Sequence, residues 1–172
     1  TKACYDAIES LLRKMAAQVE DGPCVSYIGP GGSGHFVKTV HNGIEYGIEQ
    51  ILAEAYDLMK RVASMNGDQI ADVMSYWNKT EELCSYLVEI TEACLRSKDP
   101  TDGSYIVEKI MDKAGQKGTG LWTVISALEL GASVPTIYAS LNGRVMSSMK
   151  EQRIHASKIL KDQPFSKADF GD

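Results

Sequence analysis

One long run of helical periodicity constrains the fold of this chain more than any other feature of its sequence. Between Gly34 and about Ser64, apolar residues recur at steps of three and four, which is the spacing of one face of an α-helix. These positions are Val37, Val40, Ile44, Ile48, Ile51, Ala55, Leu58 and Val62. A helix of about thirty residues is far longer than the usual mean of about 11. The run predicts one long central helix on which the other elements must pack.

Two glycines interrupt this predicted helix. Gly43 and Gly47 lie one turn apart, and each lowers helix propensity by about 1 kcal/mol relative to alanine. We therefore expect another helix, or a ligand, to approach the long helix closely at these two positions.

The remaining segments also favour helices. Their apolar spacing and their start and stop signals predict helices through residues 3–20, 70–77, 80–96, 105–114, 121–130, 135–150 and 151–160. Cys24 to Ile28, bounded by Pro23 and Gly29, has the pattern of a short strand. The predicted fold class is therefore all-α, a multi-helix domain with one long central helix and at most one short strand near the N-terminus.

Length and charge exclude several classes of protein. A chain of 172 residues is long enough for one domain with a substantial core. Its net charge of −5 and its lack of any Lys/Arg run argue against nucleic acid as a partner. No apolar run approaches the ~20 residues that a membrane-spanning helix needs. We expect neither a nucleic-acid partner nor a membrane.

The four cysteines, Cys4, Cys24, Cys84 and Cys94, are scattered along the chain. No pair has the short spacing of a zinc site, and the three histidines lie far from them in sequence, so no metal site is predicted. The pattern favours reduced thiols in a cytoplasmic protein, mostly packed in the core because free cysteine is among the most buried residue types.

A glycine-rich segment matches the pattern of a dinucleotide-binding loop. Gly29, Gly31 and Gly34 satisfy Gly-x-Gly-x-x-Gly between a predicted strand and a predicted helix. A Rossmann unit, however, needs a second parallel strand within ~30 residues, and here the chain continues as helix for about eight turns. The sequence favours a tight connection, with room for a ligand near the helix N-terminus, over a self-contained coenzyme loop.

Reactive side chains form a stripe at the start of the long helix. They are Lys38, His41, Asn42, Glu45 and Tyr46, at positions i, i+3, i+4, i+7 and i+8. At about 100° per residue they share one helix face. An amine, an imidazole, a carboxamide, a carboxylate and a phenol on one rigid element could transfer protons on a polyhydroxy substrate. Taken singly, such residues are more often a solvated helix face.

Three blocks of sequence resemble the decarboxylating 6-phosphogluconate dehydrogenase family. The first is Gly32-x-Gly34-x-x-x-Lys38-x-x-His41-Asn42-Gly43-Ile44-Glu45-Tyr46. The second runs from Ala114 to Gly120 and on through Trp122 to Glu129, and the third from Ser147 to Ile154. The wider β-hydroxyacid dehydrogenase group usually has two asparagines after the lysine, so His41-Asn42 favours the 6-phosphogluconate branch.

The resemblance implies a role for each residue. Lys38 would be the general base toward the 3-hydroxyl and then an acid toward the carbonyl oxygen, and Glu45 would protonate the enediol carbon after CO2 leaves. The substrate-binding residues would be His41 and Asn42, with Asn42 also near the nicotinamide, and a group that grips the phosphate: Tyr46, Lys117, Thr119 and Arg144.

These two catalytic roles require opposite shifts of pKa. A lysine with its ordinary pKa of about 10.4 is a poor base near neutrality, so burial or a neighbouring cation must lower the pKa of Lys38. Glu45 must be protonated to act as an acid, so an apolar or anion-rich setting must raise its pKa. Opposite shifts of this kind are typical of split acid and base roles.

The resemblance also implies what the chain does as a whole. Residues 1–33 would be the end of a coenzyme domain, and residues 34–172 part of the helical domain. The implied reaction is oxidative decarboxylation of 6-phosphogluconate to ribulose 5-phosphate with reduction of NADP, in a homodimer. Because the coenzyme domain and the C-terminal tail of the family lie outside these residues, we expect the isolated chain to be inactive.

Two alternatives to this function remain open. One is a β-hydroxyacid dehydrogenase for another, unphosphorylated substrate, against which the combination of Lys117, Thr119, Arg144 and Tyr46 argues. The other is a helical dimerisation module without chemistry, in which Lys38 and Glu45 would simply face water.

Overall fold

The computed structural model describes residues 1–161. Its α-helices are α1 (Lys2–Met15), α2 (Ser33–Arg61), α3 (Gly67–Trp77), α4 (Tyr86–Arg96), α5 (Thr119–Glu129), α6 (Pro135–Ser148) and α7 (Lys150–Ile159). Two short strands, β1 (Gln18–Val19) and β2 (Gly22–Pro23), form an antiparallel hairpin, and a 3-10 turn, η1, covers Ile106–Glu108. The predicted all-α fold class is confirmed. None of the described helices combines the length and apolar character needed to cross a membrane.

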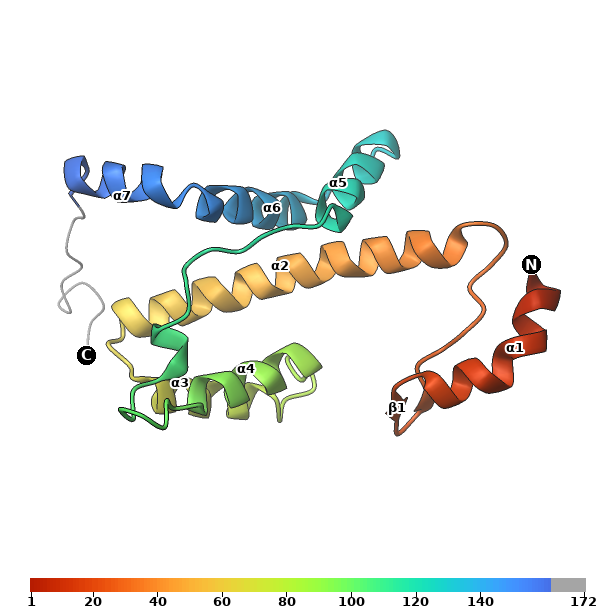
Figure 1. Ribbon diagram of the computed structural model, residues 1–172, viewed down its shortest axis with the longest axis horizontal. Coiled ribbons are helices and arrows are strands. Elements are labelled where there is room, and N and C mark those ends of the chain that lie inside the picture. Colours follow the sequence, from red (N-terminus) through yellow and green to blue (C-terminus); the bar gives the residue numbers. More distant parts are fainter. Residues whose placement is uncertain (162–172) are drawn as a thin grey trace.

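Helix α2 is the axis on which the other helices pack. In Figure 1 it crosses the middle of the molecule, with α5, α6 and α7 along one side and α3 and α4 along the other. Helix α1 and the hairpin lie apart from this layer, joined to α2 by a connecting segment. The long central helix that the periodicity predicts is therefore present, with nearly the predicted bounds.

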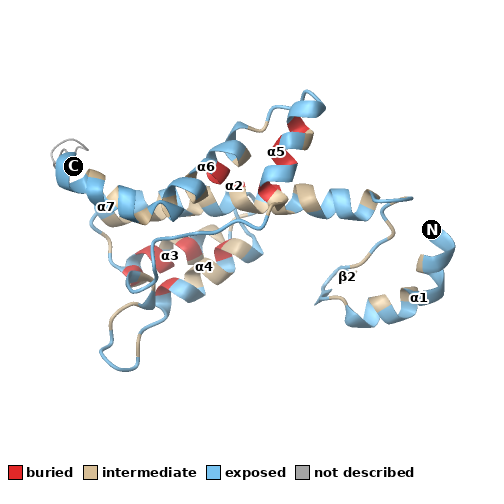
Figure 2. Ribbon diagram, turned by 45° about the horizontal axis from the view of Figure 1, so that its top comes forward, coloured by how far each residue is buried: buried red, intermediate tan, exposed pale blue. Residues whose placement is uncertain are grey.

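The buried side chains form two clusters rather than one continuous core. Figure 2 shows them on α3, α4, α5 and α6, while the surfaces of α1 and α7 are largely exposed. The apolar cluster joins α3 to α4 through Ile70, Ala71, Met74, Val88 and Leu95, and the far half of α2 covers it with Leu52, Tyr56 and Met59. The second cluster lies where α5 and α6 meet the first half of α2, and this is the half that carries the reactive stripe.

A close approach of α5 explains Gly43 but not Gly47. A Cβ atom at Gly43 would lie 2.6 Å from the side chain of Thr123 on α5, and one at Gly47 would lie 3.5 Å from Thr136 on α6. The prediction of a closely approaching helix is confirmed at Gly43, where α5 leaves no room for a side chain. At Gly47 an added Cβ would make an ordinary van der Waals contact with α6, so the structure does not require glycine there.

Two predicted helices are shorter in the structure than in the sequence analysis. Helix α4 begins at Tyr86 instead of residue 80, because Ser85 caps it by accepting a hydrogen bond from the Val88 N–H. The predicted helix 105–114 is reduced to η1, and residues 109–118 run as irregular chain toward α5. Side chains of α6 and α7 bond to this irregular segment, among them Ser147, which accepts a hydrogen bond from the Ala114 N–H, and Arg153, which donates to the Asp112 carbonyl.

The N-terminal prediction also needs correction. Residues 24–28 are not a strand; the strands precede them in the hairpin, and a single backbone bond from Cys24 N–H to the Ala17 carbonyl extends it. Without a partner strand, Cys24–Ile28 has no ladder to join. The first helix ends at Met15 because this hairpin follows it at once.

The cysteines were predicted to pack in the core, and this prediction is wrong. All four are unpaired and exposed. Cys84 lies ahead of α4 and not on it, so it shares no helix with Cys94.

Candidate active site

The first half of α2 presents a row of three titratable side chains, in which the middle one, His41, contacts both Lys38 and Glu45. The His41 Nδ1 atom lies 3.1 Å from Lys38 Nζ and 3.4 Å from Glu45 Oε2. The one-turn spacing on a helix accounts for both contacts. His41 is therefore the shared neighbour of the predicted base and the predicted acid.

The proton on His41 decides which contact is a hydrogen bond. When Nδ1 is unprotonated it accepts from the Lys38 ammonium, and when Nδ1 carries a proton it donates to the Glu45 carboxylate. Lys38 is exposed in this chain, so the desolvation expected for it is not provided by the described residues.

The predicted site residues of three segments meet around one cavity of about 580 Å³. It lies between α2, the irregular segment that precedes α5, and α6. Its lining residues are Asn42, Glu45, Tyr46, Glu49, Gly115, Gln116, Lys117, Thr119 and Arg144. Six of these are site residues that the sequence predicts, brought together from positions about one hundred residues apart. The remaining two predicted residues, Lys38 and His41, do not line the cavity but reach it through the contact of His41 with Glu45.

Arg144 of α6 joins all three walls of the cavity. Its guanidinium carbon lies 3.7 Å from the centroid of the Tyr46 ring, and its Nη1 donates to the Gly115 carbonyl over 2.7 Å. Its Nη2 forms an ion pair with Glu49. A guanidinium fixed in this way offers its remaining N–H groups at a defined position, as bidentate recognition of an oxyanion requires.

The ring of Tyr46 also packs against the backbone of α5. A Cβ atom at Gly120 would lie 2.7 Å from the Tyr46 Cδ2 and Cε2 atoms, and Gly120 is buried. Glycine at this position therefore makes room for the aromatic ring that supports Arg144.

The start of α5 faces the cavity with an unusual cap. Gly118 has φ of 108°, a conformation that favours glycine, and no side chain caps the helix. Thr119, the first residue of α5, lines the cavity. Free N–H groups in the first turn of a helix favour a bound anion.

Thr123 ties this end of α5 to α2. Its side chain is buried, and Oγ1 lies 2.9 Å from the Thr39 carbonyl of α2 and 2.8 Å from the Thr119 carbonyl. The contact lies beside Gly43, so it sets where the start of α5 sits relative to the reactive stripe.

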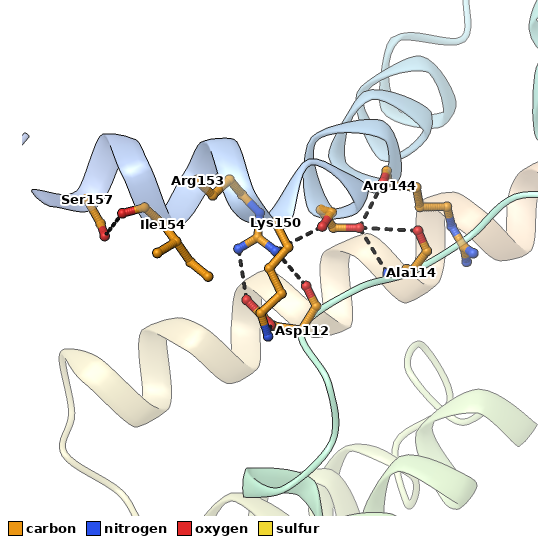
Figure 3. Close-up of polar contacts among 8 residues, drawn as sticks. Asp112, Ala114, Arg144, Lys150, Arg153, Ile154 and Ser157 are labelled. Atoms are coloured by element: carbon orange, nitrogen blue, oxygen red, sulfur yellow. Dashed lines mark hydrogen bonds and ion pairs between the residues drawn. The ribbon is translucent and has the colours of Figure 1, made fainter.

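A clamp on the irregular segment positions the loop that carries Lys117. Figure 3 shows Asp112 beside Lys150 and Arg153 at the start of α7, from which its carboxylate accepts hydrogen bonds. The Ala114 N–H donates to the Ser147 hydroxyl. The Arg153 Nη2 atom also reaches the backbone carbonyls of Asp112 and Ser147. Hydrogen bonds from Lys150 and Arg153 hold the pKa of Asp112 well below its ordinary value. The third sequence block, which begins at Ser147, thus holds the start of the second block, Ala114, in place.

Three lining residues were not predicted from the sequence. Gly115 and Gln116 belong to the second block, but nothing in their residue types singles them out. Glu49 could have been found, because it extends the stripe of α2 by one further turn beyond Glu45.

The described residues contain neither a metal cluster nor a complete dinucleotide fold. Residues 1–161 hold no group of three or more His, Cys, Asp or Glu side chains that could bind a metal. The glycine-rich segment at 29–34 leads into α2, and the sheet in this part of the chain is the two-residue hairpin.

A second cavity, of about 340 Å³, lies between α2 and α4 and is lined mainly by apolar residues such as Leu52, Leu87 and Ile90. Apart from Glu49 at its edge, it shares no residue with the first cavity and holds none of the predicted site residues.

Comparison with known proteins gives a consistent result. Residues 34–171 match the family described as "6-phosphogluconate dehydrogenase, C-terminal domain". The chain is 56% identical over 170 residues to "6-phosphogluconate dehydrogenase, decarboxylating" of Synechococcus elongatus, covering 96% of the chain and 36% of that protein. It is 52% identical over 158 residues to the chloroplastic form 1 of Arabidopsis thaliana, covering 92% of the chain and 32% of that protein.

A solved structure is also similar along the whole chain. It is that of the Plasmodium falciparum 6-phosphogluconate dehydrogenase, determined in its apo form, with its cofactor NADP+ and with its substrate 6-phosphogluconate. The TM-score is 0.90 at 42% identity, over 100% of this chain and 37% of that one. The chain spans about a third of the length of the curated relatives it matches.

Proposed function

The chain belongs to the 6-phosphogluconate dehydrogenase family, and we propose that it supplies the substrate side of an enzyme that converts 6-phospho-D-gluconate to D-ribulose 5-phosphate and CO2, with reduction of NADP. The single observation that carries this proposal is the cavity in which Glu45 of the reactive stripe meets Arg144, Lys117 and Thr119. A polyhydroxy acid that ends in a phosphate has the two kinds of group that such a lining can bind.

The phosphate of the substrate binds at Arg144, Lys117 and the start of α5. Arg144 is already fixed by Tyr46 and the Gly115 carbonyl, so little side-chain entropy is lost on binding. Lys117 adds a second positive charge, and the first N–H groups of α5 add donors beside Thr119. An unphosphorylated hydroxyacid would leave these groups without a partner.

Lys38 and Glu45 perform the proton transfers. As the neutral amine, Lys38 accepts the proton of the 3-hydroxyl while hydride leaves C3. As the carboxylate leaves as CO2, the Lys38 ammonium returns this proton to the carbonyl oxygen, which gives the enediol. Glu45 then protonates the enediol carbon while the neutral Lys38 amine takes the proton of the enediol hydroxyl at C3, and the ketone product forms. His41, in contact with both, links the two groups. General acid–base steps of this kind contribute about 10²–10⁴-fold each.

NADP, when bound, supplies the acceptor for the hydride. In the cavity, Asn42 would lie on its nicotinamide side. Residues 1–33 are the end of the domain that binds the rest of the coenzyme, in keeping with a family match that begins at residue 34.

A second copy of the chain covers the exposed apolar face of α2. Ile44, Ile48, Ile51 and Leu58 follow one stripe of this helix and are all exposed in the single chain. Apolar residues repeated along a long helix are expected to be buried by a partner. Sedimentation at increasing concentration tests this, since a monomer at all concentrations would contradict it.

The function is tested by kinetics of the complete enzyme that carries this sequence. Lys38→Met and Glu45→Gln are each expected to lower kcat for 6-phosphogluconate by about 10²-fold or more. The matched controls are Lys79→Met and Glu54→Gln, which remove the same charges from exposed sites outside the cavity. Turnover of gluconate as efficient as that of 6-phosphogluconate, or unchanged kcat in both site variants, would refute the proposal.

A further inference from the structure

A carboxylate of the same chain forms an ion pair with the arginine of the proposed phosphate site. Glu49 lines the same cavity as Arg144, Lys117 and Thr119, and it forms an ion pair with Arg144 Nη2. The Glu49 side chain is 47% exposed, whereas that of Arg144 is 20% exposed. The more exposed partner of the pair is thus the acid, at a place where an incoming anion also needs the arginine.

We infer that Glu49 sets the affinity of this site for phosphate monoesters by opposing them. When no phosphate is bound, Glu49 is the counter-ion of Arg144. A phosphate that enters the site must overcome the repulsion of the Glu49 carboxylate and take its place at Arg144. This inference rests on the proposed function, because it assigns a role within the same phosphate site.

Two contacts besides the Glu49 ion pair hold Arg144. Its guanidinium carbon lies 3.7 Å from the centroid of the Tyr46 ring, and its Nη1 donates to the Gly115 carbonyl. Removal of the Glu49 charge therefore frees Nη2 while two other contacts hold the side chain. This separates Glu49 from a residue that merely orients the arginine.

The charge on the cavity lining shows why Glu49 matters. Four charged side chains line it: Glu45 and Glu49 are acidic, and Lys117 and Arg144 are basic. With both carboxylates ionised, the lining carries no net charge, although a phosphate monoester brings about −1.5 to −2 at pH 7. Substitution of Glu49 by glutamine gives the lining one net positive charge with almost no change in side-chain size.

Opposition to the phosphate has a use in the proposed reaction. The substrate and the product, ribulose 5-phosphate, both carry a phosphate monoester, so each must bind the same groups. A carboxylate that competes for Arg144 weakens both complexes and so favours release of the product. A site that lacks it would bind the product more tightly and be inhibited by it at lower concentration.

The experiment compares Glu49→Gln with Glu54→Gln in the complete enzyme. Glu54 lies on the same helix, outside this cavity, where it accepts a hydrogen bond from Gln50. We measure KM for 6-phosphogluconate, inhibition by ribulose 5-phosphate, and the affinity for inorganic phosphate by calorimetry. Glu49→Gln is expected to tighten all three by about three- to tenfold, and Glu54→Gln to change them by less than about twofold.

Salt separates an electrostatic role from a structural one. Because the repulsion is between charges at a partly exposed site, the advantage of Glu49→Gln over the parent enzyme should shrink when ionic strength rises from about 0.05 M to 0.5 M. An unchanged or weaker phosphate affinity in Glu49→Gln, or a difference independent of salt, would overturn the inference.

The two proposals fail in different ways. Tighter phosphate binding by Glu49→Gln in a protein that does not turn over 6-phosphogluconate would support the role of Glu49 and refute the proposed function. Turnover of 6-phosphogluconate with no gain in phosphate affinity or KM would support the function and refute the role of Glu49.

Discussion

The Arg144 guanidinium carbon lies over the Tyr46 ring, 3.7 Å from its centroid. The two residues come from α6 and α2, 98 positions apart in sequence, and Gly120 of α5 packs against the Cδ2 and Cε2 atoms of the same ring. A cation over an aromatic face contributes about 0.5–2 kcal/mol, depending on desolvation. Three helices thus determine where the strongest anion-binding group of the cavity is held.

Replacement of Arg144 by lysine keeps the charge but removes the planar fork that stacks on Tyr46 and bonds to the Gly115 carbonyl. We expect Arg144→Lys to raise KM for 6-phosphogluconate by about 10- to 100-fold, because charged hydrogen bonds contribute about 1.5–3 kcal/mol. Arg61→Lys, at the exposed end of α2 where Arg61 pairs with Asp57, is the control. Equal KM values for the two variants would contradict the assigned role of Arg144.

Gly120 has a specific steric role that alanine cannot fill. A methyl group there meets the Tyr46 ring at 2.7 Å, so either the ring or α5 must shift. We expect Gly120→Ala to destabilise the protein by about 1–3 kcal/mol, a fall in Tm of a few degrees measured by calorimetry.

The control for this substitution is Gly34→Ala. Gly34 lies in the first turn of α2 with no neighbouring atom within 4 Å of an added Cβ. Alanine there is expected to leave Tm unchanged or to raise it slightly, because it improves helix propensity. A destabilisation by Gly34→Ala as large as that by Gly120→Ala would show that the steric argument is wrong.

The sequence predicts the reactive stripe well because the stripe is local. Lys38, Asn42 and Glu45 share a face of one helix, and helical periodicity alone establishes this. The meeting of Tyr46 with Arg144 is not local, since it depends on how α6 crosses α2. Gly43 and Gly47 predict that another helix approaches α2 closely, but they do not identify which helix it is.

The segment at 105–114 shows a different limit of sequence reasoning. Its apolar residues favour a helix, yet Asp112 bonds to Lys150 and Arg153, which lie about forty residues later. Tertiary contacts therefore override local propensity there. The sequence does not predict Glu49 as a lining residue, since an acidic side chain is not expected in a phosphate site.

The Asp112 clamp should make stability depend on pH at acidic values. Because Lys150 and Arg153 lower the pKa of Asp112 in the folded state, its contribution is present above the ordinary carboxyl pKa of about 4. That contribution is lost as pH falls through the lower pKa of the folded state. The Tm of the parent protein should therefore exceed that of Asp112→Asn above pH ~5, and the difference should shrink toward pH 2. A difference that grows on acidification would contradict this sign.

The contact of Gly43 with Thr123 is the tightest that joins α5 to α2. A Cβ atom at Gly43 would lie 2.6 Å from Thr123 Cγ2 and Oγ1, and Thr123 cannot rotate away without losing the hydrogen bond that its hydroxyl donates to the carbonyl of Thr39 or Thr119. We expect Gly43→Ala to destabilise the protein by about 2–3 kcal/mol, at the upper end of overpacking effects.

A double-mutant cycle tests whether this contact is the cause. Thr123→Ala removes two of the three atoms that an alanine at position 43 would meet, and it also removes the hydrogen bond that the Thr123 hydroxyl donates to the carbonyl of Thr39 or Thr119. The double variant should therefore be more stable than the sum of the single effects predicts, by about 1 kcal/mol in chemical denaturation. Strict additivity would mean that Gly43→Ala acts through helix propensity or another neighbour. A favourable coupling with a raised KM in Gly43→Ala would further link this helix contact to the placement of Thr119 at the phosphate site.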